Sequence, residues 1–284
     1  MSTNDRSASR DHLWARQFDP ASDYPHNSPT LHYAICSTPR SGGHFLCHTL
    51  HDALEFGYPL EYLNPANFRQ WKARLGETDD VSGFQRIKSL RTDRNGVFGI
   101  KLHHAHLASL YRLEARVSEY RFIYLSRNDK KQAISYARAS QTKSWISEMP
   151  SVKEAAYDWH LIFKRLQAVL TDEARWTAFF IARNLQPLAL HYEEVASDPE
   201  GTVRRCRAFL GLSLDWRSEI AGHGFLPIPQ SDSVSRAWAE RFLAETPEEI
   251  SRIFERGESG KRTPPARHRT RAETALRKLR GKFQ

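Results

Sequence analysis

The sequence predicts an α/β fold of three layers, in which a mostly parallel central sheet lies between helices. Short apolar segments alternate with longer amphipathic segments along most of the 284 residues, as expected when helices connect parallel strands. The first apolar segment leads directly into a glycine-containing loop and a helix, which is a P-loop-like arrangement of strand, loop and helix. The chain shows no internal repeat, and we expect one large domain.

The strand, loop and helix occupy residues 31–50. Residues 32–37 have the apolar pattern of a short buried strand, residues 38–43 interrupt it, and apolar residues then return at helical spacing. Glycines let the backbone approach an anion, the helix start directs N–H groups at it, and Arg40 and Ser41 add a positive charge and a hydroxyl. The loop therefore predicts a phosphate site, with an ordinary turn as the alternative. It lacks the Gly-Lys-Ser/Thr ending of nucleotide triphosphatase loops, so no magnesium ligand is predicted.

The remaining elements follow in order along the chain. We predict short helices at 67–75 and 80–90, a strand at 97–102, a helix at 107–118, a strand at 120–126, a helix at 130–142, a long amphipathic helix at 154–183, a strand at 186–192, a helix that ends near 210, and a helix at 236–256. This alternation is the basis of the predicted parallel sheet.

Polar residues follow the second predicted strand, where open α/β sheets bind ligands. Lys101, His103 and His104 lie at this carboxyl end, and Glu61 lies in an earlier loop that contains two prolines. The histidines do not predict a metal site, because no carboxylate or cysteine cluster accompanies them. Glu61 is a candidate for chemistry, although most loop carboxylates are simply solvated.

A second anion site is predicted after the third strand. Arg127 lies in the loop and Ser135 lies two turns into the following helix, so both can face the same side of a cleft. Asp129 is expected to cap this helix. A surface arginine beside an unrelated helix serine is the alternative.

The two ends of the chain differ from its body. Residues 1–30 are polar and contain three prolines, which predicts a flexible arm; residues 31–256 form the predicted domain; and residues 257–284 are a basic tail that could be disordered. The tail carries most of the net charge of +9, so charge alone is weak support for nucleic-acid binding. The three cysteines show no paired spacing, which favours a reducing, cytoplasmic location. No signal peptide or membrane-spanning segment is predicted.

Four motifs taken together resemble the bacterial carbohydrate sulfotransferases of the trehalose-sulfotransferase type. They are Thr38-Pro39-Arg40-Ser41-Gly42, Pro59-Leu60-Glu61-Tyr62, Gly96-Val97-Phe98-Gly99-Ile100-Lys101-Leu102, and Arg127-Asn128-Asp129 with Gln132-Ala133-Ile134-Ser135, Arg138-Ala139 and Gln141-Thr142. The resemblance extends to Tyr192-Glu193-Glu194 and covers roughly residues 31–215. The sequence departs from the family pattern at two places: His44-Phe45 replace a common Ser-Thr, and Tyr58 replaces a frequent acidic residue.

The resemblance implies transfer of a sulfuryl group from 3′-phosphoadenosine 5′-phosphosulfate to a hydroxyl of a carbohydrate or glycolipid. It implies that the donor's 5′-phosphosulfate binds the loop residues Thr38, Pro39, Arg40, Ser41, Gly42, Gly43 and His44. It further implies that Arg127 and Ser135 bind the 3′-phosphate and that Glu61 is the general base, with His103 or His104 in reserve. Arg40 would also stabilise the leaving phosphate. A homodimer and peripheral membrane contact through the tail are compatible with the sequence.

The expected chemistry agrees with these residue types. A transferred sulfuryl group bears one negative charge, so fixed N–H dipoles and an arginine can stabilise the leaving phosphate without a metal. A hydroxyl acceptor must lose its proton as it attacks, and a positioned base contributes about 10²–10⁴-fold. The sequence also leaves two alternatives open, a nucleotide-dependent kinase and a basic nucleic-acid-binding protein.

Overall fold

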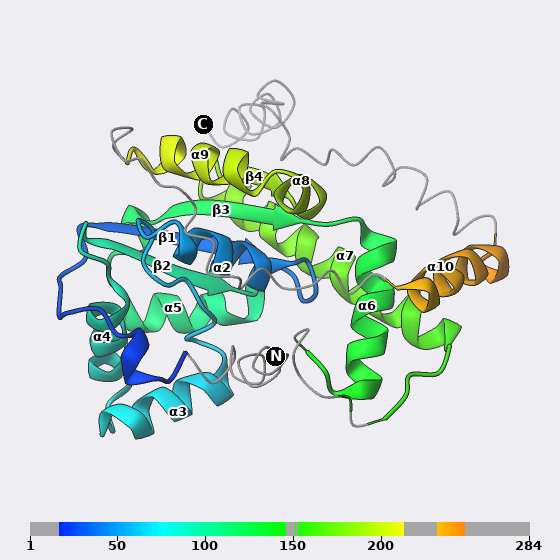
Figure 1. Ribbon diagram of the computed structural model, residues 1–284, viewed down its shortest axis with the longest axis horizontal. Helices are drawn as coiled ribbons and strands as arrows, with labels where there is room; N and C mark the ends of the chain where they lie inside the picture. The colour runs from blue at the N-terminus through cyan, green and yellow to red at the C-terminus, as the bar shows by residue number, and fades with distance from the viewer. Residues whose placement is uncertain (1–16, 146–150, 152, 213–231, 248–284) are drawn as a thin grey trace, which may run out of the picture.

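The computed structural model describes residues 17–145, 151, 153–212 and 232–247. Its centre is a four-stranded sheet of order β2-β1-β3-β4, formed by β1 (Leu31–Ser37), β2 (Val97–Leu102), β3 (Arg121–Ser126) and β4 (Leu188–His191). All three strand pairs are parallel, with Ala34 opposite Ile100 on one side and Phe122 on the other. The predicted parallel α/β sheet is confirmed (Figure 1).

Helices connect these strands and cover both faces of the sheet (Figure 1). They are α2 (Gly43–Asp52), α3 (Pro65–Leu75), α4 (Asp80–Arg91), α5 (Leu107–Leu113), α6 (Asp129–Thr142), α7 (Trp159–Ala182), α8 (Tyr192–Ser197), α9 (Pro199–Leu210) and α10 (Ser233–Glu245). Short 3₁₀ turns lie at Pro20–Ser22, His104–His106 and Val117–Glu119.

The two faces of β1 and β3 show the layers directly. Tyr33 is fully buried, and its hydroxyl donates to the carbonyl of Phe56, just beyond α2. On the opposite face, the ring of Phe122 packs against Phe179 and Phe180 of α7. Phe122 is paired with Ala34, and Tyr33 and Ala34 point to opposite faces because successive residues alternate along a strand, so helices from both sides complete the core.

A second apolar cluster joins α6, α7 and α10 beside the sheet (Figure 1). Its fully or nearly fully buried members are Ala133, Ile134, Ala137, Ile162, Leu166, Trp238 and Phe242. These residues recur at helical spacing and fix the orientation of α6, which carries Ser135. The side chain of Asn128, not the predicted Asp129, caps α6 by accepting from the N–H of Lys131.

The helices differ from the predicted ones at several points. The predicted helix 107–118 ends at Leu113, because the chain turns at Glu114, whose backbone is extended. The predicted helix 154–183 begins at Trp159, where Asp158 caps it. The predicted helix that ends near 210 is α9, which begins at Pro199; the shorter helix α8, of 6 residues, precedes it and is not predicted from the sequence.

Residues 17–30, part of the predicted flexible arm, lie against α4. Arg91 is completely buried, and its guanidinium donates to the carbonyls of Gln17 and Ser22 and pairs with Asp23 at 3.1 Å. Tyr24 N–H also donates to the carbonyl of Leu90 at 3.0 Å. A buried guanidinium needs partners, and this segment supplies them. Residues 1–16 and the predicted tail 257–284 lie outside the described residues.

Among the described helices, none is both long enough and apolar enough to cross a membrane.

Candidate functional site

The loop 38–43 joins β1 to α2 and packs closely against the side chains of Tyr192 and Lys101. Gly42 precedes α2 with a φ of 89°, and no side chain caps this helix start. A Cβ at Gly42 would lie 2.0 Å from the ring of Tyr192, and one at Gly43 would lie 2.3 Å from Lys101 Cε. Only glycine fits either position without rearrangement. The first N–H groups of α2 therefore point into a cradle that suits an anion.

Two hydroxyls at this cradle are buried and have no partner among the described residues. They are Ser37 Oγ and Ser41 Oγ, in residues that are 0% and 1% exposed. A Cβ at Gly43 would lie 3.2 Å from Ser37 Oγ, which places this hydroxyl at the start of α2. Since burying an unpaired hydroxyl costs about 1–3 kcal/mol, the arrangement suits a ligand that completes it.

Arg40 connects the loop to α6. Its Nε donates to Ser135 Oγ at 3.1 Å, and its Nη1 donates to the carbonyl of Trp145. Arg127 donates from Nη1 to the backbone carbonyl of Arg40 at 3.0 Å and stacks on Tyr192, 4.6 Å from the ring centre. The sequence predicts Arg40 in one anion site and Ser135 in another; the structure brings both into one group.

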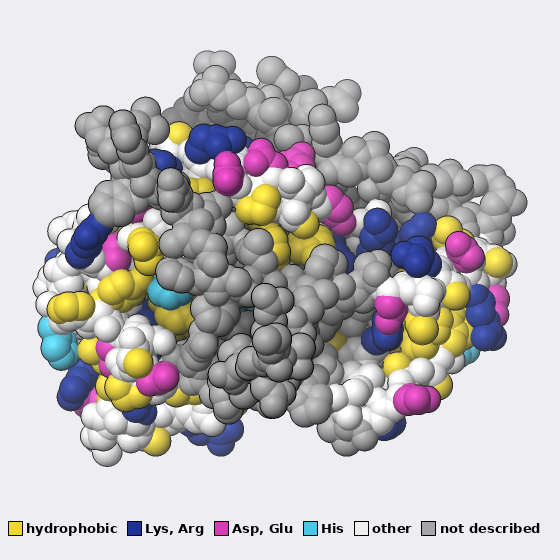
Figure 2. Space-filling model, in the orientation of Figure 1, with side chains coloured by type: hydrophobic (Ala, Val, Ile, Leu, Met, Phe, Trp, Pro, Cys, Tyr) yellow, Lys and Arg dark blue, Asp and Glu magenta, His cyan; other side chains and the backbone are white. Residues whose placement is uncertain are grey.

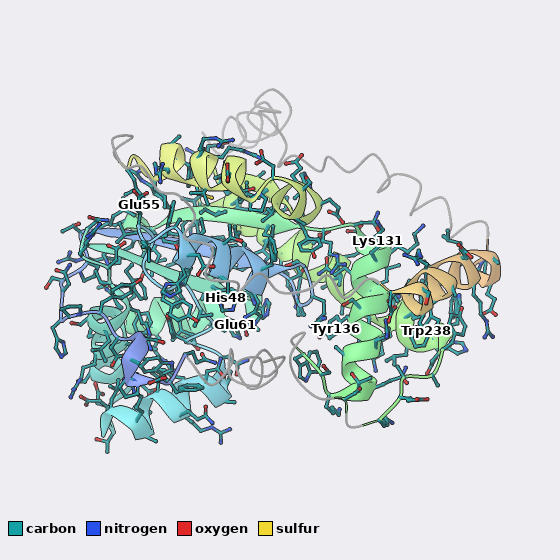
Figure 3. The ribbon with its side chains drawn as sticks, in the orientation of Figure 1. His48, Glu55, Glu61, Lys131, Tyr136 and Trp238 are labelled. Atoms are coloured by element: carbon teal, nitrogen blue, oxygen red, sulfur yellow. The ribbon has the colours of Figure 1, made fainter. Side chains whose placement is uncertain are left out.

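The charges in this group favour an anion. Burial and the nearby positive charge of Arg127 lower the pKa of Arg40 to about 10, so it remains a cation at neutral pH. Burial likewise lowers the pKa of Arg127, and its Nε is buried without a partner among the described residues. Figure 2 shows further Lys and Arg side chains gathered over α6, on which Figure 3 labels Lys131. Two adjacent guanidiniums repel each other, and a bound dianion would relieve that repulsion.

Glu61 lies on the other side of the loop, beside the end of β2. Leu60 pairs with Ile100 as in a parallel sheet, and Lys101 N–H donates to the carbonyl of Leu60 at 2.9 Å. This short pairing brings the Glu61 carboxylate to the Lys101 ammonium, with which it forms a buried ion pair. Figure 3 shows Glu61 near α2, while Tyr136, next to Ser135, lies on α6.

Three nitrogen groups contact the same oxygen of Glu61. Lys101 Nζ pairs with Oε1, His103 Nε2 lies 3.2 Å from it, and His44 Nε2 lies 3.6 Å from it. Burial alone would raise the pKa of Glu61, but Lys101 and His103 outweigh burial and hold it well below its usual value. Burial and the charge of Lys101 lower the pKa of His44 to about 3, so this imidazole is neutral at neutral pH. Glu61 is therefore an anion in a positive surrounding.

The two reserve histidines lie in different places. His103 Nδ1 donates to the carbonyl of Ser37 at 3.0 Å, which turns Nε2 toward Glu61. His104 packs edge-on against the ring of Trp176, with 5.3 Å between ring centres. The contacts that the structure describes for Glu61 include His103 but not His104. The structure therefore brings one of the two histidines to Glu61.

A family model described as Stf0 sulphotransferase matches residues 32–245. The chain belongs to this sulfotransferase family. Membership selects the sulfotransferase interpretation among the three that the sequence alone left open, and makes the protein an enzyme that transfers sulfate. No curated protein matches the chain in a sequence search.

Solved sulfotransferase structures also resemble the chain. The mouse sulfotransferase SULT7A1 complexed with PAP is 16% identical, covers 86% of this chain and 72% of its own, and has a TM-score of 0.38. A sulfotransferase from Alicyclobacillus acidocaldarius is 14% identical, with coverages of 77% and 94% and a TM-score of 0.41. The sulfotransferase domain from the curacin biosynthetic pathway is 15% identical, with coverages of 77% and 99% and a TM-score of 0.43.

The structure adds three residues to the candidate site that the sequence analysis does not assign. The sequence places Lys101 only at the end of a strand, whereas in the structure its side chain reaches both Glu61 and the start of α2. Tyr192 covers Gly42 and supports Arg127. Gln132 donates to Thr38 and Pro39 of the loop. Lys101 could have been found because it ends a strand beside the loop; the others depend on how β4 and α6 pack. No group of three metal-ligating side chains occurs within the described ranges.

Proposed function

We propose that this sulfotransferase takes its sulfuryl group from 3′-phosphoadenosine 5′-phosphosulfate and transfers it to a hydroxyl of a carbohydrate or glycolipid. The transfer is in-line and uses no metal. The carbohydrate class follows from the motif resemblance, and the donor is supported by the geometry of the loop and α6.

The observation that carries the donor assignment is the pair of anion-binding groups that meet at Arg40. The donor bears phosphate groups on two carbons of one ribose, so its site needs two adjacent positive groups. The loop supplies the start of α2 and the hydroxyl of Ser41, which has no partner within the described part of the chain. Arg127 and Ser135 supply the second group, and Arg40 Nε lies 3.1 Å from Ser135 Oγ. The residues present therefore fit both phosphates.

Glu61 supplies the base in this proposal. Lys101, His103 and His44 contact Oε1 of its carboxylate, and Oε2 is the oxygen assigned to the acceptor hydroxyl. When bound, the donor provides an activated sulfate whose bond to the 5′-phosphate breaks. Glu61 takes the acceptor's proton at Oε2, while Lys101 and the N–H groups of α2 hold positive charge beside Gly43, where negative charge develops. His103 turns the carboxylate by its contact with Oε1.

Calorimetry of the full chain tests the donor. Adenosine 3′,5′-bisphosphate should bind with or without magnesium and raise the melting temperature, because a ligand that binds only the folded state stabilises it. ATP should give neither effect. Absence of binding by the bisphosphate at millimolar concentration would sink the donor assignment. A labelled sulfate donor and a screen of sugars, glycolipid fragments and other hydroxyl compounds then tests the acceptor class; exclusive labelling of non-carbohydrate compounds would overturn it.

A further inference from the structure

Gln132 is a fully buried residue of α6, and its side-chain amide contacts the loop 38–43 through its nitrogen. Its Nε2 donates to Thr38 Oγ1 at 2.5 Å and to the carbonyl of Pro39 at 2.7 Å. A carbonyl can only accept, so the contact with Pro39 fixes which end of the amide is nitrogen. The opposite atom, Oε1, is buried and has no partner among the described residues.

Gln132 lies close to both anion-binding groups of the candidate site. Gln132 and Ser135 are three residues apart on α6 and therefore share a face of the helix. Ser135 belongs to the group of Arg40 and Arg127, whereas Thr38 belongs to the loop that leads into α2. Gln132 thus lies between the two groups to which the proposed function assigns the two phosphates. What joins those phosphates in the donor is the ribose.

The ribose of a 3′,5′-bisphosphate has one hydrogen-bond donor. Its 3′ and 5′ oxygens are esterified and its ring oxygen only accepts, so the 2′-hydroxyl alone can donate. We propose that Gln132 Oε1 accepts a hydrogen bond from the 2′-hydroxyl of the bound nucleotide, and that it thereby selects ribonucleotides over 2′-deoxyribonucleotides. This inference rests on the proposed function. The adenine amino group is the other donor of the ligand, but it lies beyond the ribose, away from both phosphates.

The loop has a way to admit the ligand to this buried oxygen. Arg40, next to Pro39, has a φ of 67°, a left-handed conformation that is unfavourable for a residue other than glycine. Its side chain rests on Ser135, in the place assigned to a phosphate. Entry of the nucleotide moves Arg40 onto the phosphate and opens the loop above Gln132.

Calorimetry on the full chain with two ligands tests the proposal. The ligands are adenosine 3′,5′-bisphosphate and its 2′-deoxy analogue, and the proteins are wild type, Gln132→Met and Thr38→Val. The wild type should prefer the ribonucleotide by about five- to tenfold, the value of one hydrogen bond. Gln132→Met should bring the ratio of the two affinities to within about twofold of one. Thr38→Val removes only the hydroxyl that accepts from Gln132 Nε2, so it should lower the affinity for both ligands while the ratio of the two affinities stays as in wild type.

Each contrary result has a distinct meaning. Equal affinity of the wild type for both ligands overturns the inference and leaves the donor assignment standing, whereas absence of binding by either ligand overturns the donor assignment itself. If Gln132→Met weakens both ligands and keeps the wild-type ratio, Gln132 only positions the loop and the inference is wrong. If this variant does not fold, the 2′-fluoro-2′-deoxy analogue decides on wild type alone. Fluorine cannot donate, so this analogue must bind as weakly as the deoxy compound.

Discussion

Arg40 and Ser135 are 95 residues apart in the chain, and Arg40 Nε lies 3.1 Å from Ser135 Oγ. The sequence predicts these residues at two different phosphates. Their contact changes the expected role of Arg40, because its guanidinium lies at α6, whereas Lys101 is the cation beside the start of α2. Arg40 should therefore recognise the phosphate next to Ser135, and the stabilisation of the leaving phosphate should depend more on Lys101.

Arg40→Ala should lower the affinity for adenosine 3′,5′-bisphosphate far more than the affinity for adenosine 5′-monophosphate, which lacks the 3′-phosphate. Loss of charge-assisted hydrogen bonds costs on the order of 1.5–3 kcal/mol, or roughly 10- to 150-fold in affinity. Calorimetry with both ligands measures the difference. Arg127→Ala should show the same selectivity. Equal weakening of the two ligands by Arg40→Ala would instead place its guanidinium at the 5′ end, as the sequence alone suggests.

Ser135→Ala should weaken the bisphosphate by a smaller amount, because a neutral hydroxyl contributes about 1 kcal/mol. Ser140→Ala is a matched control on the same helix: its hydroxyl donates to the carbonyl of Tyr136 within α6, at 2.8 Å. The control should leave the affinity within about twofold of wild type. If both variants lost affinity equally, the effect would come from α6 as a whole and not from a contact of Ser135.

Much of the proposed donor site follows from local sequence. Glycines after a buried strand, a helix start, and Arg127 with Ser135 at a spacing of eight residues each have a local physical meaning, and the structure places them along one edge of the sheet. The direction of the Arg40 side chain has no such local origin. It depends on a left-handed backbone conformation at Arg40, which sequence patterns do not predict for arginine.

The surroundings of Glu61 depend on a contact between distant segments. Leu60 pairs with Ile100, forty residues later in the chain, and this pairing alone brings the carboxylate to Lys101. A loop with two prolines gives no pattern from which that pairing follows. The sequence likewise could not predict which of His103 and His104 contacts Glu61, because this depends on Trp176 of α7, which packs against His104.

The Glu61–Lys101 ion pair should make stability depend on pH. The pKa of Glu61 is depressed in the folded state, so its contribution is present above the unfolded value near 4.5 and is lost as pH falls through the folded value. Glu61→Gln should lower the free energy of unfolding at pH 7 by on the order of 3 kcal/mol, since it leaves Lys101 buried without a counter-charge. The difference from wild type, measured by denaturant unfolding, should shrink below about pH 4.5.

A double-mutant cycle distinguishes the ion pair from general packing. Lys101→Met removes the buried ammonium, so the double variant Glu61→Gln with Lys101→Met should be more stable than the sum of the two single losses predicts. Additive losses would show that the pair contributes no coupling, despite the contact between Lys101 Nζ and Glu61 Oε1.

Gly42→Ala and Gly76→Ala form a matched pair for the loop. Both glycines have positive φ, 89° and 66°, so alanine costs roughly 1–2 kcal/mol of backbone strain at each. A Cβ at Gly76 meets nothing within 4 Å, whereas a Cβ at Gly42 would lie 2.0 Å from Tyr192 Cδ2. Gly42→Ala should therefore displace the ring that supports Arg127, destabilise the protein further and weaken the bisphosphate. Equal stability losses and unchanged affinity would show that Tyr192 yields without consequence.

The last prediction concerns the base. Glu61→Gln keeps the size of the side chain but removes its basicity, so turnover should fall by about 10²–10⁴-fold while the affinity for adenosine 3′,5′-bisphosphate stays nearly unchanged. His103→Ala should lower turnover less, because His103 contacts Oε1 and orients the carboxylate. His104→Ala is the control, since its ring packs on Trp176 and not on Glu61. Turnover needs an acceptor, so the acceptor screen comes first. If Glu61→Gln retained near-normal turnover and His103→Ala abolished it without loss of donor affinity, the proton would go to the imidazole, and the depressed pKa of Glu61 would mark a carboxylate that only holds His103 in place.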